Sequence, residues 1–242
     1  MSDQYPENTK AAFQAAINQQ ADAIECDLQF TADQRIVVCH DETFERYGHP
    51  AVRVATATAD QLRSLDMGSW FHPDFCDERL MTADELLNEF SEQIPLLLEI
   101  KNSTHSGDVT DAFLTQLVSL VTRHDAQHRV AMLCFDPGIL QRLHELAPWA
   151  TLVLNTDEPQ RLGPADLRRQ SWLDAVDGNI GHLTQPAIQL FQEQGLSTQC
   201  FTCDSESDVL KAWDLGIDTI ITNDPARTHR LLHEHRSETY ET

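Results

Sequence analysis

From Leu96 onward, the hydrophobic and polar positions follow one repeating pattern. Short apolar runs alternate with longer amphipathic segments, and most of these segments open with a residue that caps or starts a helix. Short apolar strands that alternate with amphipathic helices predict βα units and a parallel sheet. The helix starts are Asp108, Asp136-Pro137, Gly163-Pro164, Thr184, Ser205 and Asp224-Pro225. The expected parallel strands, with one near the N-terminus, are about 23–28, 96–101, 130–135, 151–155, 175–180, 197–202 and 219–222.

The first part of the chain has a different pattern. An amphipathic helix is expected from Pro6 to Gln20. Two strands, 22–30 and 35–40, follow with only Thr31–Gln34 between them. Four residues cannot make a parallel crossover, so these strands are expected to form a hairpin.

An insertion over about 42–81 separates this hairpin from the regular pattern. It contains a helical segment capped by Thr58 and an aromatic cluster, Trp70-Phe71-His72-Pro73-Asp74-Phe75. Thr82 and Glu85 then form a capping box for a helix that ends near Phe90.

The pattern predicts a single α/β domain over residues 1–242, of the TIM (βα)₈ barrel type. Seven parallel strands are visible in the sequence, whereas such a barrel has eight. Because the chain opens on a helix with no strand before it, the first barrel strand is the one expected to be missing.

Composition narrows the class of protein. With 17 Lys and Arg against 39 Asp and Glu, the formal charge is −22, which argues against nucleic acid as a partner. No apolar run approaches the roughly 18 residues of a membrane span, and the first 25 residues lack the apolar segment of a signal peptide. In a chain of 242 residues without a visible signal peptide, six cysteines favour buried, reduced thiols and a cytoplasmic location. Cys200 and Cys203 are expected on opposite faces of a strand, which disfavours a redox or zinc role.

Three short signals carry candidate chemistry. Glu25 and Asp27 are two apart on one strand, as are Glu99 and Lys101 on the next, so each pair shares a face. His40 ends the second hairpin strand, where it is expected roughly opposite Glu25. The carboxyl ends of barrel strands form the active-site face of this fold.

These residue types point to phosphoester chemistry. Converging carboxylates repel one another, and a hard cation such as Mg²⁺ or Ca²⁺ compensates them better than zinc would. A cation beside a lysine attracts an anionic phosphate, and a histidine supplies proton transfer near neutral pH. Each signal alone is weak. A Glu and a Lys inside an apolar strand nevertheless require a partner.

Read in order, the motifs resemble the glycerophosphodiester phosphodiesterase family. The resemblance covers essentially the whole chain, and the ordered set is more specific than any one motif. The matching segments are Pro6-Glu-Asn-Thr9, Ile24-Glu-Cys-Asp27, Thr31-Ala-Asp-Gln34 (with Gln34 in place of a glycine), Val37-Val-Cys-His-Asp41, Gly68-Ser-Trp-Phe71, Leu98-Glu-Ile-Lys101 and Gly216-Ile-Asp-Thr-Ile-Ile-Thr222.

The resemblance implies a role for each matching residue. Glu25, Asp27 and Glu99 would bind Mg²⁺ or Ca²⁺, His40 would be a general acid/base, and Lys101 would contact phosphoryl oxygens. Phe201 stands where the family has Trp or Tyr, as an apolar wall of the substrate pocket without a hydrogen-bond donor. The implied reaction is hydrolysis of a small-molecule glycerophosphodiester to an alcohol and sn-glycerol 3-phosphate.

The largest departure from the family is at the start, where its His-Arg-Gly strand is absent. Either the start codon was assigned too late, which we favour, or the chain is truly truncated. Two alternative functions follow: a catalytically impaired barrel that binds metal or phosphodiester, and a related phosphodiesterase that acts on lysophospholipids or sphingomyelin. The alcohol group and the oligomeric state leave no mark in the sequence.

Two further groups of histidines are weaker candidates. His229 and His233 are four apart on the last helix, which we interpret as structural. His182 follows the strand at 175–180 and is a candidate substrate contact at the rim.

Overall fold

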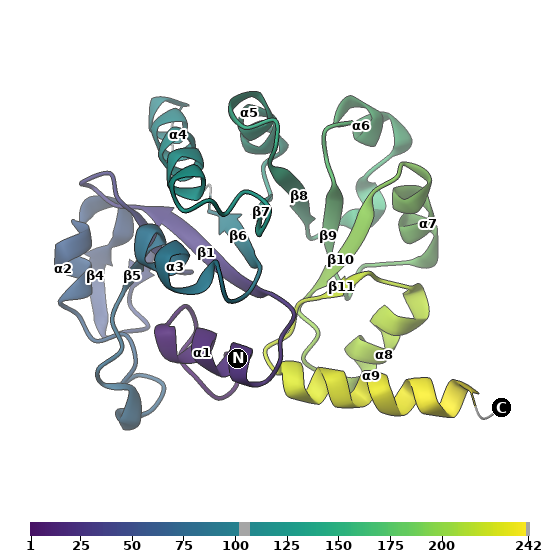
Figure 1. The fold of residues 1–242 in the computed structure, drawn as a ribbon, viewed down its shortest axis with the longest axis horizontal. Coiled ribbons are helices and arrows are strands. Elements are labelled where there is room, and N and C mark those ends of the chain that lie inside the picture. The colour runs from purple at the N-terminus through teal and green to yellow at the C-terminus, as the bar shows by residue number, and fades with distance from the viewer. Residues whose placement is uncertain (102–106, 241–242) are drawn as a thin grey trace.

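A computed structural model describes residues 1–101 and 107–240 as one curved sheet with helices along its outer side (Figure 1). The nine strands of the sheet lie in the order β11-β10-β9-β8-β7-β6-β1-β2-β5, and a separate two-stranded sheet pairs β3 with β4. The main-sheet strands are β1 (Ile24–Phe30), β2 (Ile36–Val38), β5 (Met81–Thr82), β6 (Leu96–Ile100), β7 (Val130–Cys134), β8 (Thr151–Thr156), β9 (Ala175–Asn179), β10 (Ser197–Phe201) and β11 (Thr219–Ile220).

The helices follow the strands as the alternating pattern predicts. No helix in the described ranges is both long and apolar enough to cross a membrane. The helices are α1 (Lys10–Asn18), α2 (Ala59–Arg63), α3 (Ala83–Phe90), α4 (Gly107–Arg123), α5 (Pro137–Leu146), α6 (Pro164–Arg169), α7 (Gln185–Glu193), α8 (Glu206–Leu215) and α9 (Pro225–Tyr240).

The seven predicted parallel strands are confirmed as β1 and β6 to β11. Each pairs in parallel with its neighbour in the order β1-β6-β7-β8-β9-β10-β11. Within the described ranges, no strand pairs with the free edge of β11 or with the first residues of β1 on the side away from β6. The sheet is therefore of the TIM-barrel type, with these two edges unpaired.

Five of the predicted helix starts are confirmed, because helices begin directly after Asp136, Gly163, Thr184, Ser205 and Asp224, whereas α4 begins one residue before Asp108, at Gly107. Asp136 accepts a hydrogen bond from the backbone N–H of Gly138 at the start of α5, and Thr82 and Ser205 form capping boxes for α3 and α8. The first helix also differs from the prediction, because it begins at Lys10 rather than at Pro6. Thr9 is its N-cap, and Asn8 before it has a left-handed φ of 57° that no helix can contain.

The predicted hairpin is confirmed, but its register is shifted by one residue. Phe30 pairs with Ile36 and Leu28 with Val38, so His40 continues opposite Cys26 and not opposite Glu25. The shift arises because Phe30 and Ile36 are the last paired residues, so five residues connect the strands in place of the expected four, with Gln34 at a left-handed φ of 57°.

The insertion folds as a lobe with a small core of its own. It holds β3 (Thr43–Phe44), β4 (His49–Arg53) and α2, and it lies beside α3 at one end of the molecule (Figure 1). Phe44, Leu62 and Met67 are fully buried in this lobe. Its aromatic side chains contact one another in a row from Phe44 through Tyr47 and Trp70.

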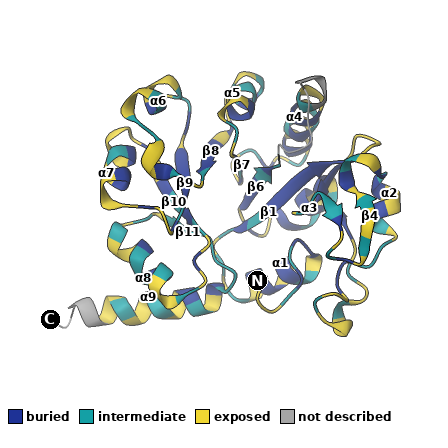
Figure 2. Ribbon diagram, turned by 180° about the vertical axis from the view of Figure 1, so that it is seen from behind, coloured by how far each residue is buried: buried dark blue, intermediate teal, exposed yellow. Residues whose placement is uncertain are grey.

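The main core has two faces because side chains alternate across each strand. Leu98, Met132 and Leu152 face the helices in one large cluster. Leu97, Leu133 and Val153 belong to a second cluster on the concave face. Burial is concentrated in the strands, while the outward faces of the helices are exposed (Figure 2).

Five of the six cysteines are buried and Cys76 is exposed; all six are free thiols. The expectation that Cys200 and Cys203 point apart is wrong, since their sulfur atoms lie 3.3 Å from each other. The physical reason is that β10 ends at Phe201, so Cys203 no longer follows the alternation of the strand.

The cap of α5 gives a test of the fold. Asp136→Ala removes the side chain that satisfies the Gly138 N–H, and it should lower the free energy of unfolding by about 1 kcal/mol. Asp136→Asn keeps an acceptor and should stay within about 0.5 kcal/mol of the wild type. Urea denaturation followed by circular dichroism measures both, and an alanine variant that unfolds at the wild-type midpoint would contradict the assignment.

Candidate active site

The three predicted carboxylates meet at one place on the concave side of the sheet. Glu25 and Asp27 extend from β1, and Glu99 extends from β6, where Asp27 and Glu99 are direct neighbours across the strand pair. One oxygen from each carboxylate lies within 4.8 Å of the other two. The side chains of Asp27 and Glu99 are only 8% and 12% exposed, so little water screens their mutual repulsion.

Lys101 supplies positive charge to this carboxylate trio. Its Nζ lies 2.8 Å from Asp27 Oδ1 and also pairs with Glu99 Oε1. Burial opposes the charge on the ammonium, but the two carboxylates outweigh burial and raise the pKa of Lys101 above its ordinary value. The predicted pairing of a lysine with the carboxylates is therefore present as a direct contact.

Glu25 is the carboxylate without a charge partner at hydrogen-bond distance. The residue is partly buried within the site, and its Oε1 is buried with no hydrogen-bond partner among the described residues. Burial, followed by the charges of Asp27 and Glu99, raises the pKa of Glu25 well above its ordinary value. Burial and Asp27 also raise the pKa of Glu99. The trio thus holds more negative charge than Lys101 alone compensates.

Two asparagines that the sequence analysis did not single out orient the trio. Asn8 Nδ2 donates to Asp27 Oδ2 at 2.8 Å, and the Asp27 backbone N–H donates back to Asn8 Oδ1 at 3.2 Å. Asn155 Nδ2, at the end of β8, donates to Glu99 Oε2 at 3.1 Å. In the sequence, Asn8 could have been found only through its place in the Pro6–Thr9 motif. Asn155 could have been found only because it is a polar residue inside an apolar strand.

Asp177 is a fourth carboxylate on the same concave face, and it too escaped the sequence analysis. It lies in β9, in register with Asn155 of β8, and it is 1% exposed. Burial first, and then the charge of Glu99, raise its pKa well above the ordinary value. A further carboxylate at this position increases the negative charge that must be compensated in the cleft.

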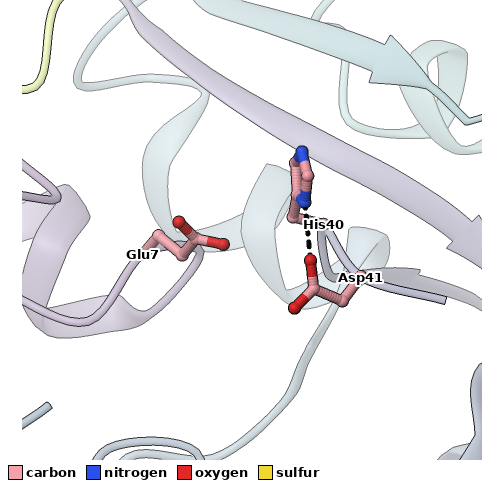
Figure 3. A group of neighbouring side chains, drawn as sticks. All are labelled: Glu7, His40 and Asp41. Atoms are coloured by element: carbon pink, nitrogen blue, oxygen red, sulfur yellow. Dashed lines mark hydrogen bonds and ion pairs between the residues drawn. The ribbon is translucent and has the colours of Figure 1, made fainter. Parts of the chain in front are cut away.

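His40 lies just beyond β2, where its side chain faces the same cleft as the trio. Its Nδ1 donates to the Asp41 carboxylate at 2.8 Å, which leaves Nε2 on the opposite side of the ring (Figure 3). The backbone of this segment is fixed by the buried Gln29. The amide Nε2 of Gln29 lies 2.8–3.0 Å from the carbonyl oxygens of Cys39, His40 and Asp41.

A cleft of about 1200 Å³ contains these groups. Phe201, predicted as a wall, lines it together with Phe135, and their ring centroids lie 5.9 Å apart. Phe135 was predicted only as the last residue of the strand 130–135, whereas β7 ends at Cys134 and Phe135 directly follows it. The cleft continues between the unpaired edges of β1 and β11, where Ile24 and Ile220 line it.

The weaker histidine candidates are not grouped with the trio, although His229 lines the same cleft. His182 is not among the described residues that line the cleft, and its Nδ1 donates to the carbonyl of Asp157 at 2.6 Å. His229 faces Asp22 at 3.6 Å, and neither it nor His233 belongs to a described group of side chains that could hold a metal ion.

Charged groups on the concave side of parallel strands, above an apolar layer, are typical of enzymes of the TIM-barrel type. A family model described as the glycerophosphoryl diester phosphodiesterase family matches residues 1–227, and the chain belongs to this family. This membership places it among the phosphoric diester hydrolases.

Individual relatives agree with this assignment. A glycerophosphodiester phosphodiesterase of Caldanaerobacter subterraneus is 28% identical over 233 residues, which cover 94% of this chain and 92% of that protein. One from Bacillus subtilis is 24% identical over 239 residues, covering 93% and 82%. Among solved structures, an Oleispira antarctica phosphodiesterase in complex with the product sn-glycerol-3-phosphate superposes with a TM-score of 0.87 at 21% identity, covering 96% of this chain and 93% of that one.

The buried carboxylate of Glu25 predicts a pH dependence of stability. Its pKa is raised on folding, so the folded chain keeps a proton that the unfolded chain releases above the ordinary value of 4.5. In the presence of a chelator, the wild type should therefore lose stability as the pH rises through the raised pKa. Glu25→Gln lacks this loss, so its advantage in Tm should grow between about pH 5 and about pH 8.

Thermal unfolding of both proteins in a metal chelator measures this difference. Glu92→Gln, at an exposed position, is the matched control and should follow the wild type at every pH. A Tm difference between Glu25→Gln and the wild type that stays constant with pH would show that Glu25 titrates normally.

Proposed function

We propose that this protein hydrolyses glycerophosphodiesters to an alcohol and sn-glycerol 3-phosphate, with Mg²⁺ or Ca²⁺ bound by Glu25, Asp27 and Glu99. In this reaction the oxygen of water forms a new bond to phosphorus. The bond from phosphorus to the alcohol oxygen breaks, and a proton goes to that oxygen. The observation that carries the proposal is the buried carboxylate trio, with Lys101 beside it and His40 in the same cleft.

The donor set fits a hard divalent cation. All three ligand atoms are carboxylate oxygens, which Mg²⁺ and Ca²⁺ prefer, and they lie within 4.8 Å of one another. Glu25 Oε1 is buried without a hydrogen-bond partner, as expected for an oxygen that a cation completes. When bound, the ion would neutralise charge on the phosphate and polarise it toward attack.

The remaining groups of the cleft have separate tasks. The ammonium of Lys101 binds a non-bridging phosphate oxygen, because it is the cationic side chain in direct contact with the trio. His40 Nε2 exchanges the proton, taking it from water or giving it to the departing alcohol oxygen. Phe135 and Phe201 exclude water from one side of the substrate.

The choice of a glycerophosphodiester as substrate is supported by family membership and by the related phosphodiesterase with sn-glycerol-3-phosphate bound. A cleft of about 1200 Å³ has room for both halves of such a molecule. We place the activity in the breakdown of glycerophospholipid headgroups. We also place it in the cytoplasm, since six free cysteines favour a reducing compartment.

A second candidate function follows from the number of histidines at the site. Two histidines line the cleft among the described residues. His40 lies at the same end of the sheet as the trio, and His229 extends from α9. A site with one proton-transfer group binds metal and phosphodiester but turns over slowly. In that case the product or an unreactive analogue would bind with metal, while hydrolysis would stay near the background rate.

Glu99→Ala tests the proposed function directly. It removes one carboxylate of the trio, so metal-dependent release of glycerol 3-phosphate from glycerophosphocholine should fall by about 1000-fold, or about 4 kcal/mol in the activation barrier. A coupled enzymatic assay for glycerol 3-phosphate measures the rate, with and without a chelator, over a panel of glycerophosphodiesters.

Glu92→Ala is the matched control, because it removes an exposed glutamate from the segment just before β6. It should keep the wild-type rate. Full activity of Glu99→Ala, or a wild-type rate that a chelator does not change, would refute the metal assignment. Metal-dependent binding of glycerol 3-phosphate without hydrolysis would favour the second candidate.

A further inference from the structure

A chain of polar contacts connects His40 to the insertion. His40 Nδ1 bonds to Asp41, and the guanidinium of Arg46 bonds to the same carboxylate at 2.9–3.0 Å. Arg46 also pairs with Glu7, which comes from the loop before α1. Figure 3 shows Glu7 directed toward the His40–Asp41 pair from this separate segment.

Arg46 also contacts an aromatic ring of the insertion. Its guanidinium carbon lies 5.2 Å from the centroid of the Trp70 ring, a cation–π distance. Trp70 is itself fixed, because its indole N–H donates to the carbonyl of Met67 at 2.8 Å and its ring contacts Tyr47. The insertion thus presents a rigid guanidinium to Asp41.

Glu7, His40 and Asp41 also have the spacing of a metal-binding group, since one ligand atom from each lies within 4.8 Å of the others. Arg46 argues against a cation there. Its guanidinium already contacts both carboxylates and compensates their charge, and it would repel a metal ion at the same point. The group is better explained as an arrangement that holds an imidazole.

The orientation of His40 needs such an arrangement. Its side chain is 49% exposed, so packing alone does not fix the ring. Asp41 fixes which ring nitrogen carries the proton, but a carboxylate beside solvent is free to rotate unless its second oxygen is also bound. Arg46 binds both oxygens of Asp41 and removes that freedom.

We propose that Arg46 is a positioning residue for the proton transfer by His40, acting through Asp41 and held by Glu7 and Trp70. The inference rests on the proposed function, in which His40 exchanges a proton with water or the departing alcohol. It gives the insertion a task in the reaction: the insertion anchors the guanidinium that keeps Nδ1 of His40 protonated and Nε2 directed away from Asp41.

The ring nitrogens of His40 report this role without any need for turnover. In ¹⁵N-labelled protein at a pH where the imidazole is neutral, the wild type should show one dominant tautomer with the proton on Nδ1. Arg46→Gln should show a mixture of the two tautomers. Arg46→Lys keeps the positive charge but lacks the planar guanidinium that bonds to both oxygens of Asp41. Its ratio of the two tautomers should lie between those of the wild type and Arg46→Gln. The His40→Asn spectrum identifies the His40 signals among the 11 histidines.

Kinetics provide the second measurement. Arg46→Gln should lower kcat for glycerophosphocholine by about tenfold to hundredfold, as is typical when a supporting hydrogen-bond partner is lost, with KM within about twofold of the wild type. Arg53→Gln is the matched control, because Arg53 also belongs to the insertion but pairs with Glu42 at the surface. It should change neither kcat nor the His40 signals.

Each outcome decides the inference. If Arg46→Gln does not fold, Asp41→Asn removes the same acceptor charge while the contact between Arg46 and Trp70 remains, and it should give the same mixture of tautomers. Unchanged His40 signals in a folded Arg46→Gln protein would overturn the proposal, whatever happens to kcat. A wild type without turnover would count against the proposed function, whereas the tautomer measurement would still decide the role of Arg46.

Discussion

The structure is organised around buried negative charge that must be compensated. Glu25, Asp27 and Glu99 meet at one end of a parallel sheet, and Lys101 neutralises only part of their charge. Beneath them the concave face is closed by apolar side chains such as Leu97 and Leu133, which keep water and its screening away. Carboxylates in such a place either hold protons or bind a cation. The raised pKa values of Glu25 and Glu99 and the proposed metal site are therefore two consequences of the same constraint.

The surrounding polar groups are arranged around this constraint. Asn8 and Asn155 donate to Asp27 and Glu99, so these two carboxylates are oriented even before a cation is considered. Gln29 lies two positions after Asp27 on the same face of β1, and its amide fixes the backbone on either side of His40. A single strand therefore supplies two carboxylates of the trio and the support for His40, the proposed proton-transfer residue. β1 is buried along nearly its whole length because it pairs with β6 on one side and β2 on the other.

How far the sequence predicts this arrangement depends on the kind of signal. Alternation of apolar runs and capped helices predicts the seven parallel strands, because backbone hydrogen bonding and burial are periodic. The spacing of Glu25 and Asp27 predicts a shared face for the same reason. Asn8 and Arg46 have no such periodicity: each acts from a loop through a contact that only the folded chain creates. The register of His40 was missed by one residue because a single added turn residue shifts every later pair.

The net charge of −22 opposes an anionic substrate only at long range. At physiological salt, charges beyond about 8 Å are largely screened, so the acidic surface contributes little inside the cleft. In the proposed reaction, a phosphate group would meet the ammonium of Lys101 and the cation that the trio would hold. Arg46, by contrast, forms ion pairs with Glu7 and Asp41, and its positive charge compensates these two carboxylates. In this proposal, the attraction for a phosphodiester depends on Lys101 and on the cation held by the trio, and not on the overall charge of the protein.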